Sequence, residues 1–184
     1  GHEPKQEAIP APQTQPAEQR AIRPLILLRK ALDDLPGAYE RLRDDLEPDW
    51  EADLRRFLGE QQRRAERILR AGGDTADQLI VEGEAELLGE LLTPRQLSLL
   101  DDVHRLVVGE LGIAFDLDDQ ATRAYLALAG ENIVGITETT RSAVQAALIA
   151  GQQAGEGIPE LAARLQALPA FGPKRARTVA RTEL

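Results

Sequence analysis

Residues 50–69 read WEADLRRFLGEQQRRAERIL. Apolar side chains recur along this stretch every three or four positions, at Trp50, Leu54, Phe57, Leu58, Ala65, Ile68 and Leu69. Because an α-helix turns once every ~3.6 residues, this spacing gathers them on one face and leaves Arg and Glu on the other. The stretch therefore predicts an amphipathic helix that begins after Pro48 and ends at Gly72-Gly73, since glycine suits a helix C-terminus.

Upstream of this stretch, a shorter helix is indicated by leucines at helical spacing from Leu25 to Leu35, and Pro36-Gly37 interrupts it. Residues 1–24 have a different character. Gly1-His2 has the form of a tag remnant, and five prolines among Gln, Glu and Ala follow it. Such a segment has little to bury and favours extended conformations, so we expect a disordered Pro-rich linker.

Downstream, the residues that start and stop helices divide the chain further. Thr75 and Gln78 have the spacing of a capping box and predict one helix start. Thr93-Pro94 predicts another start, and Gly112 an end. Residues 113–118 predict a short extended connection, and the pattern weakens around Gly130–Gly135, where we expect a break. Further boundaries are predicted at Asp118, Thr137, Gly151–Gly157, Pro159 and Pro169.

No stretch of useful length alternates as a half-buried strand would. The sequence therefore predicts an all-α fold: an elongated bundle of seven or eight helices with short connections and a disordered Pro-rich N-terminal tail. We divide it into the linker at 1–24, an N-terminal helical region at 25–111 and a second helical region at 112–184. The chain lacks an initiator Met and stops inside an expected helix, so we expect a fragment of a longer protein.

Composition restricts the function. Of the 184 residues, 42% are hydrophobic and 29% charged, which is enough apolar material for a core. Cysteine is absent, so neither a disulfide nor a thiolate metal site can form. A net charge of −9 argues against a globally basic nucleic-acid binder, though not against a local basic patch. No apolar run approaches the ~20 residues of a membrane span.

Catalytic and metal-binding patterns are weak. His104 lies one helical turn from Asp101, a spacing that can hold a metal, but a structural site needs further ligands. A calcium loop is suggested by Asp116, Asp118 and Asp119, yet the central glycine and the closing glutamate of such a loop are missing. Helix capping explains these aspartates better. The sequence therefore predicts no enzyme, no catalytic residue, no metal and no cofactor.

The best local candidate for a contact site is the C-terminal stretch FGPKRARTVARTEL, residues 171–184. Gly172-Pro173 predicts a helix start. Lys174, Arg177 and Arg181 then stack one turn apart on one face, which is mildly unfavourable unless a partner offsets it, and Arg175 adds a fourth cation to the strip. The cations of this strip are Lys174, Arg175, Arg177 and Arg181. They suit a solvated face or salt bridges first, and an acidic protein surface or DNA phosphates as alternatives.

A similar cluster of cations, with the same alternatives, lies on the Trp50 helix. Its members are Arg63, Arg64, Arg67 and Arg70.

The C-terminal stretch also carries a family resemblance. Arg175-Ala176, followed by Val179-Ala180-Arg181-Thr182-Glu183, is similar to the RA..IARTE signature of the phage Mu F-like head morphogenesis (minor capsid) family. The resemblance covers roughly residues 50–184 and is closest over 112–184. Departures are Ile158-Pro159, where a Ser-containing helix start is common, and Leu184, beyond which the family continues. Other matching pieces follow in the family's order, at Ala114–Leu117, Tyr125, Asn132–Thr137, Thr140-Arg141, Gly151–Gly157 and Leu161-Ala162.

The resemblance implies a minor head protein of a tailed phage or prophage, acting in capsid assembly near the portal and without catalytic residues. Its implied partners are phage head and portal proteins, with packaged double-stranded DNA left open. Its implied location is the virion interior, or the host cytoplasm during assembly. Family members are sometimes fused to a portal protein or to a toxin or enzymatic domain. The chain as the non-catalytic part of such a fusion is therefore an alternative.

The repeat of Arg177-Thr178 at Arg181-Thr182, one helical turn later, motivates a specific hypothesis. This face of the last helix contacts either the rest of the chain or a head component. The rival is a DNA-binding module that uses the same arginines. Candidate contact residues are Lys174, Arg175, Arg177, Arg181, Thr182 and Glu183.

Overall fold

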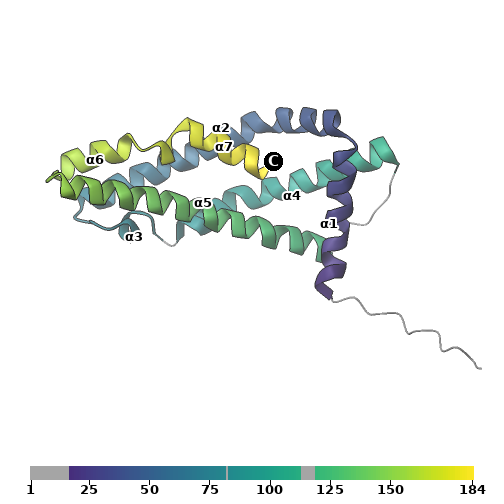
Figure 1. The fold of residues 1–184 in the computed structure, drawn as a ribbon, viewed down its shortest axis with the longest axis horizontal. Coiled ribbons are helices and arrows are strands. Elements are labelled where there is room, and N and C mark those ends of the chain that lie inside the picture. Colours follow the sequence, from purple (N-terminus) through teal and green to yellow (C-terminus); the bar gives the residue numbers. More distant parts are fainter. Residues whose placement is uncertain (1–16, 82, 113–118) are drawn as a thin grey trace, which may run out of the picture.

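A computed structural model describes residues 17–81, 83–112 and 119–184 of the chain. The described residues contain no strand, which confirms the all-α prediction. Within the described residues, seven α-helices and one short 3-10 turn, η1, follow one another (Figure 1): α1 Ala17–Asp33, α2 Pro36–Arg70, α3 Ala76–Leu79, α4 Gly83–Leu111, α5 Asp119–Gln153, α6 Ile158–Gln166, η1 Pro169–Phe171 and α7 Pro173–Glu183.

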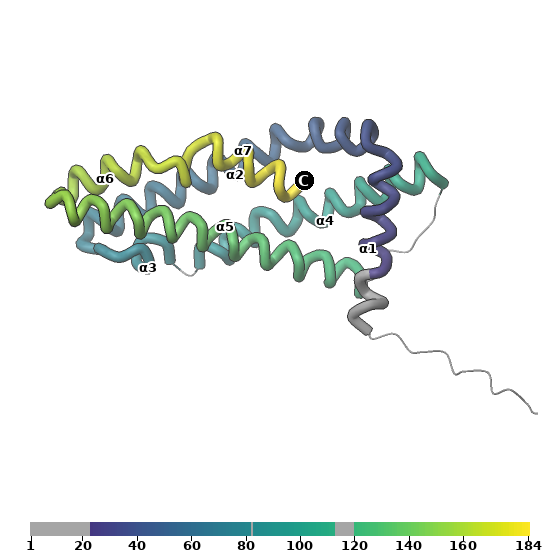
Figure 2. Tube along the Cα trace, viewed as in Figure 1, coloured from purple at the N-terminus to yellow at the C-terminus, as the bar shows by residue number. Residues whose placement is uncertain are grey.

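The helices form an elongated bundle, as expected. The long helices α2, α4 and α5 run lengthwise, and α1 crosses them at one end (Figure 1). The chain returns through α6, η1 and α7 along the upper side in the tube view of Figure 2. α7 packs chiefly against α2, and it ends midway along the bundle, while α2 and α4 continue toward α1 (Figure 2).

Two hydrophobic clusters hold the bundle together. One lies toward α1 and is built around Trp50, which is 2% exposed, with residues from α1, α2, α4, α5 and α7. The other lies between the C-terminal halves of α2 and α5, and it includes α3, α6 and Phe171 of η1. Because α2 and α7 contribute to the first cluster, the last helix is part of the core and not an appendage.

Several expected helix starts and stops are confirmed. Thr75 Oγ1 accepts from the Gln78 amide at 3.3 Å, and the Gln78 side chain accepts from the Thr75 amide, which completes the capping box. Gly112 follows the end of α4 with φ of 65°, a backbone conformation that glycine adopts without strain. Pro159 opens α6 and Pro173 opens α7, each in the first turn.

Two predicted interruptions were wrong. α2 runs through Pro48 and α4 runs through Pro94, where the sequence had suggested helix starts. A proline inside a helix costs about 3 kcal/mol, but apolar contacts on both sides of each proline offset it. Leu46 and Trp50 flank Pro48 and belong to the first hydrophobic cluster or pack against it, and Leu92 and Leu99 flank Pro94 and are buried in the same cluster.

The predicted break at Gly130–Gly135 was also wrong, because α5 is continuous. Ala129, Ile133 and Thr137 are buried one turn apart, so one packed stripe continues through both glycines. Thr137 is consequently not a helix cap. Its hydroxyl donates to the Ile133 carbonyl at 3.2 Å, a bond that threonine makes within a helix.

The structure differs from the sequence prediction at two further places, the start of α1 and the segment after Thr75. α1 begins at Ala17 and includes Pro24, so the helix extends into the expected linker. The single helix expected to follow Thr75 is divided, because α3 ends at Leu79 and α4 begins at Gly83. Residues 1–16 and the connection at 113–118, with the expected cap at Asp118, lie outside the described residues.

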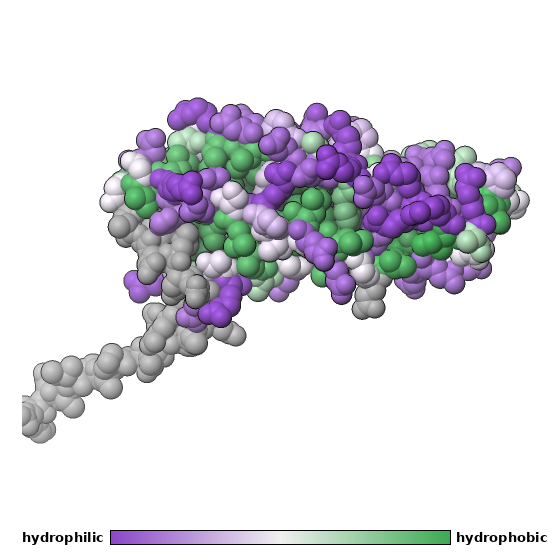
Figure 3. Space-filling model, turned by 180° about the vertical axis from the view of Figure 1, so that it is seen from behind, coloured by the Kyte–Doolittle hydropathy of each residue, from purple (hydrophilic) through white to green (hydrophobic). Residues whose placement is uncertain are grey.

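On the face seen in Figure 3, hydrophilic side chains dominate, with apolar patches between them.

Candidate functional site

α7 carries the sequence-predicted contact residues, and its apolar face explains its position. Gly172 occupies the N-cap and Pro173 the first turn. Ala176, Val179 and Ala180 are 0%, 3% and 0% exposed. Small side chains let the helix backbone approach α2 closely, so the charged residues on the adjoining face of α7 come within reach of α2.

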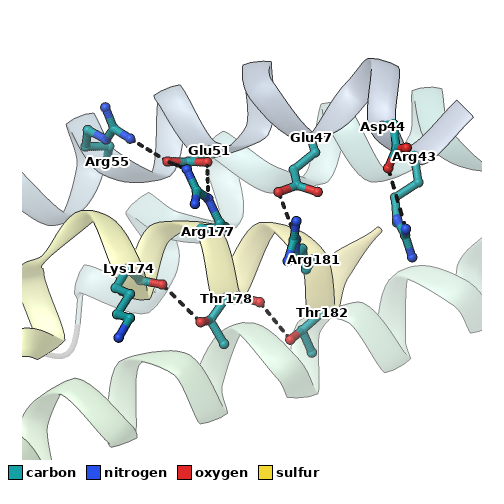
Figure 4. Close-up of polar contacts among 10 residues, drawn as sticks. All are labelled: Arg43, Asp44, Glu47, Glu51, Arg55, Lys174, Arg177, Thr178, Arg181 and Thr182. Atoms are coloured by element: carbon teal, nitrogen blue, oxygen red, sulfur yellow. Dashed lines mark hydrogen bonds and ion pairs between the residues drawn. The ribbon is translucent and has the colours of Figure 1, made fainter. Parts of the chain in front are cut away.

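Two arginines of the predicted strip pair with glutamates of α2 (Figure 4). Arg177 Nε lies 2.9 Å from Glu51 Oε2, and Arg181 Nε lies 2.8 Å from Glu47 Oε1. Glu51 also accepts from Arg55 on its own helix. The two arginines are four residues apart, as are the two glutamates, so the pairs repeat along the α2–α7 contact.

The carboxylate of Glu51 is the electrostatic centre of this contact. Its side chain is only 11% exposed, whereas that of Arg177 is 57% exposed. The hydrogen bond from Arg177 is the largest influence on the Glu51 carboxyl and lowers its pKa, with a further lowering by Arg55 and an opposing effect of burial. Glu47, Glu51, Arg55, Arg177 and Arg181 line a shallow groove of about 680 Å³.

The other residues of the strip have different surroundings. Lys174 is exposed, and its side chain has no ion pair in the described part of the chain. Arg175 is half-buried, and its Nε is buried without a hydrogen-bond partner among the described residues. The Thr182 hydroxyl donates to the Thr178 carbonyl at 2.8 Å, within α7 (Figure 4). The strip is therefore not one continuous contact surface.

Glu183 faces inward, away from the arginines. Its Oε2 accepts from Gln96 Nε2 of α4 at 3.2 Å. Burial is the largest influence on Glu183 and raises its pKa, while hydrogen bonds from Gln96 and Asn132 lower it. Burial also raises the pKa of the neighbouring Tyr125 to about 12, with smaller contributions from Glu183 and Tyr39.

These groups line a second cavity of about 720 Å³ at the end of α7, bounded by α1, α2, α4, α5 and α7. Its leucine, valine and alanine lining residues come from α1, α4 and α5, with Leu184 at the end of the chain.

As in the strip on α7, the arginines of the cluster on α2 have different surroundings. Arg64 forms a two-point ion pair with the fully buried Glu84, with distances of 2.8 Å from Nε and 2.5 Å from Nη2. Its neighbours Arg63, Arg67 and Arg70 are exposed and have no ion pair within the described part of the chain. Among the described residues, Arg64 is thus the one member of this cluster that pairs with a buried carboxylate.

Among the described residues, neither a metal-binding cluster nor a membrane-spanning helix is found. In that part of the chain, no group of three or more His, Cys, Asp or Glu residues could hold a metal ion. Asp101, one helical turn from His104, forms an ion pair with Arg105. No described helix combines the length and the apolar character needed to span a bilayer.

Sequence reasoning missed three residues of this site: Glu47, Glu51 and Gln96. A usable signal existed for the first two, because the i, i+4 spacing of Glu47 and Glu51 matches that of Arg177 and Arg181. Nothing in the sequence links the helices, however, since the paired residues are 126 and 134 positions apart. Gln96 lies three residues after Thr93, so its spacing indicated a helix start and not a hydrogen-bond partner for Glu183.

Comparison with known proteins adds no assignment: no protein-family model matches the sequence, and no curated protein and no solved structure is significantly similar to it.

Proposed function

We propose that the chain is a non-catalytic assembly protein that acts through protein–protein contacts, as a minor head protein of a tailed phage or prophage near the portal. The ordered motifs that resemble the Mu F-like family support the phage assignment. Phage head and portal proteins are the proposed partners, in the virion interior or in the host cytoplasm during assembly.

One observation supports contacts with protein over contacts with DNA. The most specific motif of the resemblance forms α7, and two of its four cations, Arg177 and Arg181, already pair with Glu51 and Glu47. Phosphates would have to displace these carboxylates, and the net charge of −9 opposes a polyanion further. The α7 arginines accordingly serve to dock the helix on α2.

A charge exchange separates the two roles. In one variant, Arg177 and Arg181 become Glu. In the second, Glu47 and Glu51 also become Arg and Arg55 becomes Glu, which restores all three pairs with their signs reversed. The assay counts heads by electron microscopy when the chain is produced together with phage portal, scaffold and major capsid proteins.

We expect fewer heads with the first variant and recovery with the second, because docking of α7 needs opposite charges and not a particular order of them. Heads that form equally well without the chain would refute the assembly role. A defect that persists in the exchanged variant would assign the arginines to an external partner.

DNA binding by the strip is the alternative, and salt distinguishes it. Binding of duplex DNA through phosphates must weaken steeply as salt concentration rises. The matched variants are Arg177→Ala with Arg181→Ala, and Arg63→Ala with Arg67→Ala on the exposed face of α2. A salt-dependent affinity that only the first pair abolishes would establish the alternative.

A further inference from the structure

A shallow groove runs between α2 and α4 at the surface of the bundle. It measures about 200 Å³, and its apolar lining comes from Phe57 of α2 and from Leu87 and Leu91 of α4. Leu87 is 45% exposed, so an apolar side chain of the groove faces solvent. Arg64 also lines the groove, with its guanidinium carbon 6.0 Å from the centre of the Phe57 ring, and its ion pair with the buried Glu84 joins the two helices. The walls of the groove are therefore held in place by the core.

Two ion pairs set the alignment of α2 and α4 along this groove. Asp53 of α2 accepts from Arg95 Nε of α4 at 2.9 Å, and Arg64 pairs with Glu84 farther along. The two pairs are separated by the same number of residues on each helix, counted in opposite directions. The helices therefore run antiparallel, as Figure 2 shows, and keep one alignment over the whole stretch. Each residue of α2 in this stretch has a residue of α4 at its own level.

Exposed charges of opposite sign flank the groove at matching levels. On α2, Arg56 and Arg63 are exposed and lie about two helical turns apart on one face. On α4, Glu86 and Glu90 are exposed and lie one turn apart. In the alignment set by the ion pairs, Arg63 is within about one residue of the level of Glu86, a rise of ~1.5 Å. Arg56 is within about two residues of the level of Glu90, a rise of ~3 Å.

These charges are available to a partner. Within the described part of the chain, Arg63, Glu86 and Glu90 have no ion pair. Arg56 has only a loose contact of 3.8 Å with Asp53, and its side chain is 74% exposed. No ion pair joins the arginines of α2 to the two glutamates across the groove, so one copy of the chain leaves both rows of charge unsatisfied.

The distribution of charge is self-complementary. A two-fold axis that runs along the groove places α2 of a second copy over α4 of the first at the same level. Each row of arginines then faces a row of glutamates, and the leucines of the two grooves meet at the axis, in the isologous contact that is usual in homodimers. An acidic protein surface or DNA would attract the arginines but would be repelled by the glutamates beside them.

We propose that the chain forms a two-fold dimer through this groove. Arg63 of each copy pairs with Glu86 of the other, Arg56 pairs with Glu90, and Leu87 becomes buried between the copies. Burial of Leu87 supplies apolar stabilisation, and the charge pairs set the orientation of the copies. This surface is distinct from the α2–α7 contact, and the inference does not depend on the proposed role in head assembly.

Sedimentation velocity of the chain and of two charge-reversed variants tests the dimer. At about 100 μM we expect the unaltered chain to sediment with twice the 20.1 kDa mass of one copy, and to dissociate on dilution. The acidic variant is Arg56→Glu with Arg63→Glu, and the basic variant is Glu86→Arg with Glu90→Arg. Each variant would bring like charges together in its own dimer, so its Kd should rise at least about a hundredfold.

An equimolar mixture of the two variants tests the pairing itself. In a mixed dimer, the introduced glutamates of the acidic variant face the introduced arginines of the basic variant, and the remaining native charges face each other on the other side of the axis. We therefore expect the mixture to recover the dimer. Native mass spectrometry should show one copy of each variant in it.

Matched variants separate the groove from general effects of charge. Arg41→Glu with Lys174→Glu changes the net charge as much as the acidic variant does, at exposed residues that do not line the groove. This control should dimerise like the unaltered chain. Leu87→Ser should raise the Kd by about tenfold, because it removes an apolar contact at the axis. Circular dichroism of dilute samples confirms that each variant folds.

Three results would overturn the inference. The first is an unaltered chain that stays monomeric at the stated concentration. The second is a dimer that either charge-reversed variant leaves unchanged. The third is a mixture of the two variants that stays monomeric, which would assign the charges to a partner other than a second copy. None of these measurements involves heads, so a failure of the dimer is distinct from a failure of the assembly role.

Discussion

Loss of the Arg64–Glu84 pair should destabilise the bundle more than the loss of any exposed charge. The Glu84 side chain is 1% exposed, and Arg64 is the partner of both its oxygens. Removing one partner of a buried ion pair costs roughly 3–5 kcal/mol, because the other charge stays buried without compensation. The Arg64 side chain is 27% exposed, so water screens part of the interaction, and we expect about 3 kcal/mol for Arg64→Met.

This loss is large enough to measure by two independent signals. For a domain of this size, each kcal/mol lowers the melting temperature by roughly 2–4 °C, so the variant should melt about 6–12 °C lower. Urea unfolding, followed by circular dichroism and by the fluorescence of the buried Trp50, gives the free energy directly. Arg63→Met is the control, since Arg63 is exposed and should change stability by less than ~0.5 kcal/mol.

The double variant Arg64→Met with Glu84→Leu tests the reasoning itself. It removes both charges, so it should be more stable than Arg64→Met alone. If Arg64→Met loses no more stability than Arg63→Met, or if the double variant is no more stable than Arg64→Met alone, the buried carboxylate does not depend on Arg64.

Four further substitutions test other parts of the structure, each by urea unfolding. The raised pKa of Glu183 means that its contribution to stability is lost as pH rises above the unfolded pKa, so Glu183→Gln should gain stability at neutral pH and little near pH ~4. The raised pKa of Tyr125 predicts a stability that falls between pH ~10 and about 12, and Tyr125→Phe should flatten that fall. The lowered pKa of Glu51 predicts a contribution that is present above pH ~4.3 and lost in acid, and Glu51→Gln should remove this dependence. In Gly151→Ala, the new Cβ would overlap the Leu161 side chain; overpacking of about 1–3 kcal/mol outweighs a helix-propensity gain of about 1 kcal/mol, so stability should fall.

Local signals predicted helix termini well where the chain folds back, and poorly inside long helices. Gly172-Pro173 and the Thr75–Gln78 capping box mark termini because their effect is confined to one turn. Pro48, Pro94 and the glycines at 130–135 are the same kinds of signal, but buried residues on both sides keep each helix intact. Helix interiors are decided by packing, and packing partners are not visible in a local pattern.

The candidate site shows the same division between local and distant information. The sequence located the arginines of α7 and indicated that stacked cations need a partner. It could not choose among solvent, α2, another protein and DNA, because each offers acceptors to an arginine. The choice depends on how the small residues Ala176 and Ala180 seat α7 against α2, which is a property of the folded bundle.

Pairing along the α2–α7 contact has a consequence for where partners can bind. A partner that engages Arg177 or Arg181 must first compete with a carboxylate held within 3 Å, in contrast to one that meets Arg63 or Arg67. Contacts that add stability to an assembly should therefore form first at these exposed arginines of α2, which have no ion pair within the described part of the chain, so that binding there does not have to break existing pairs.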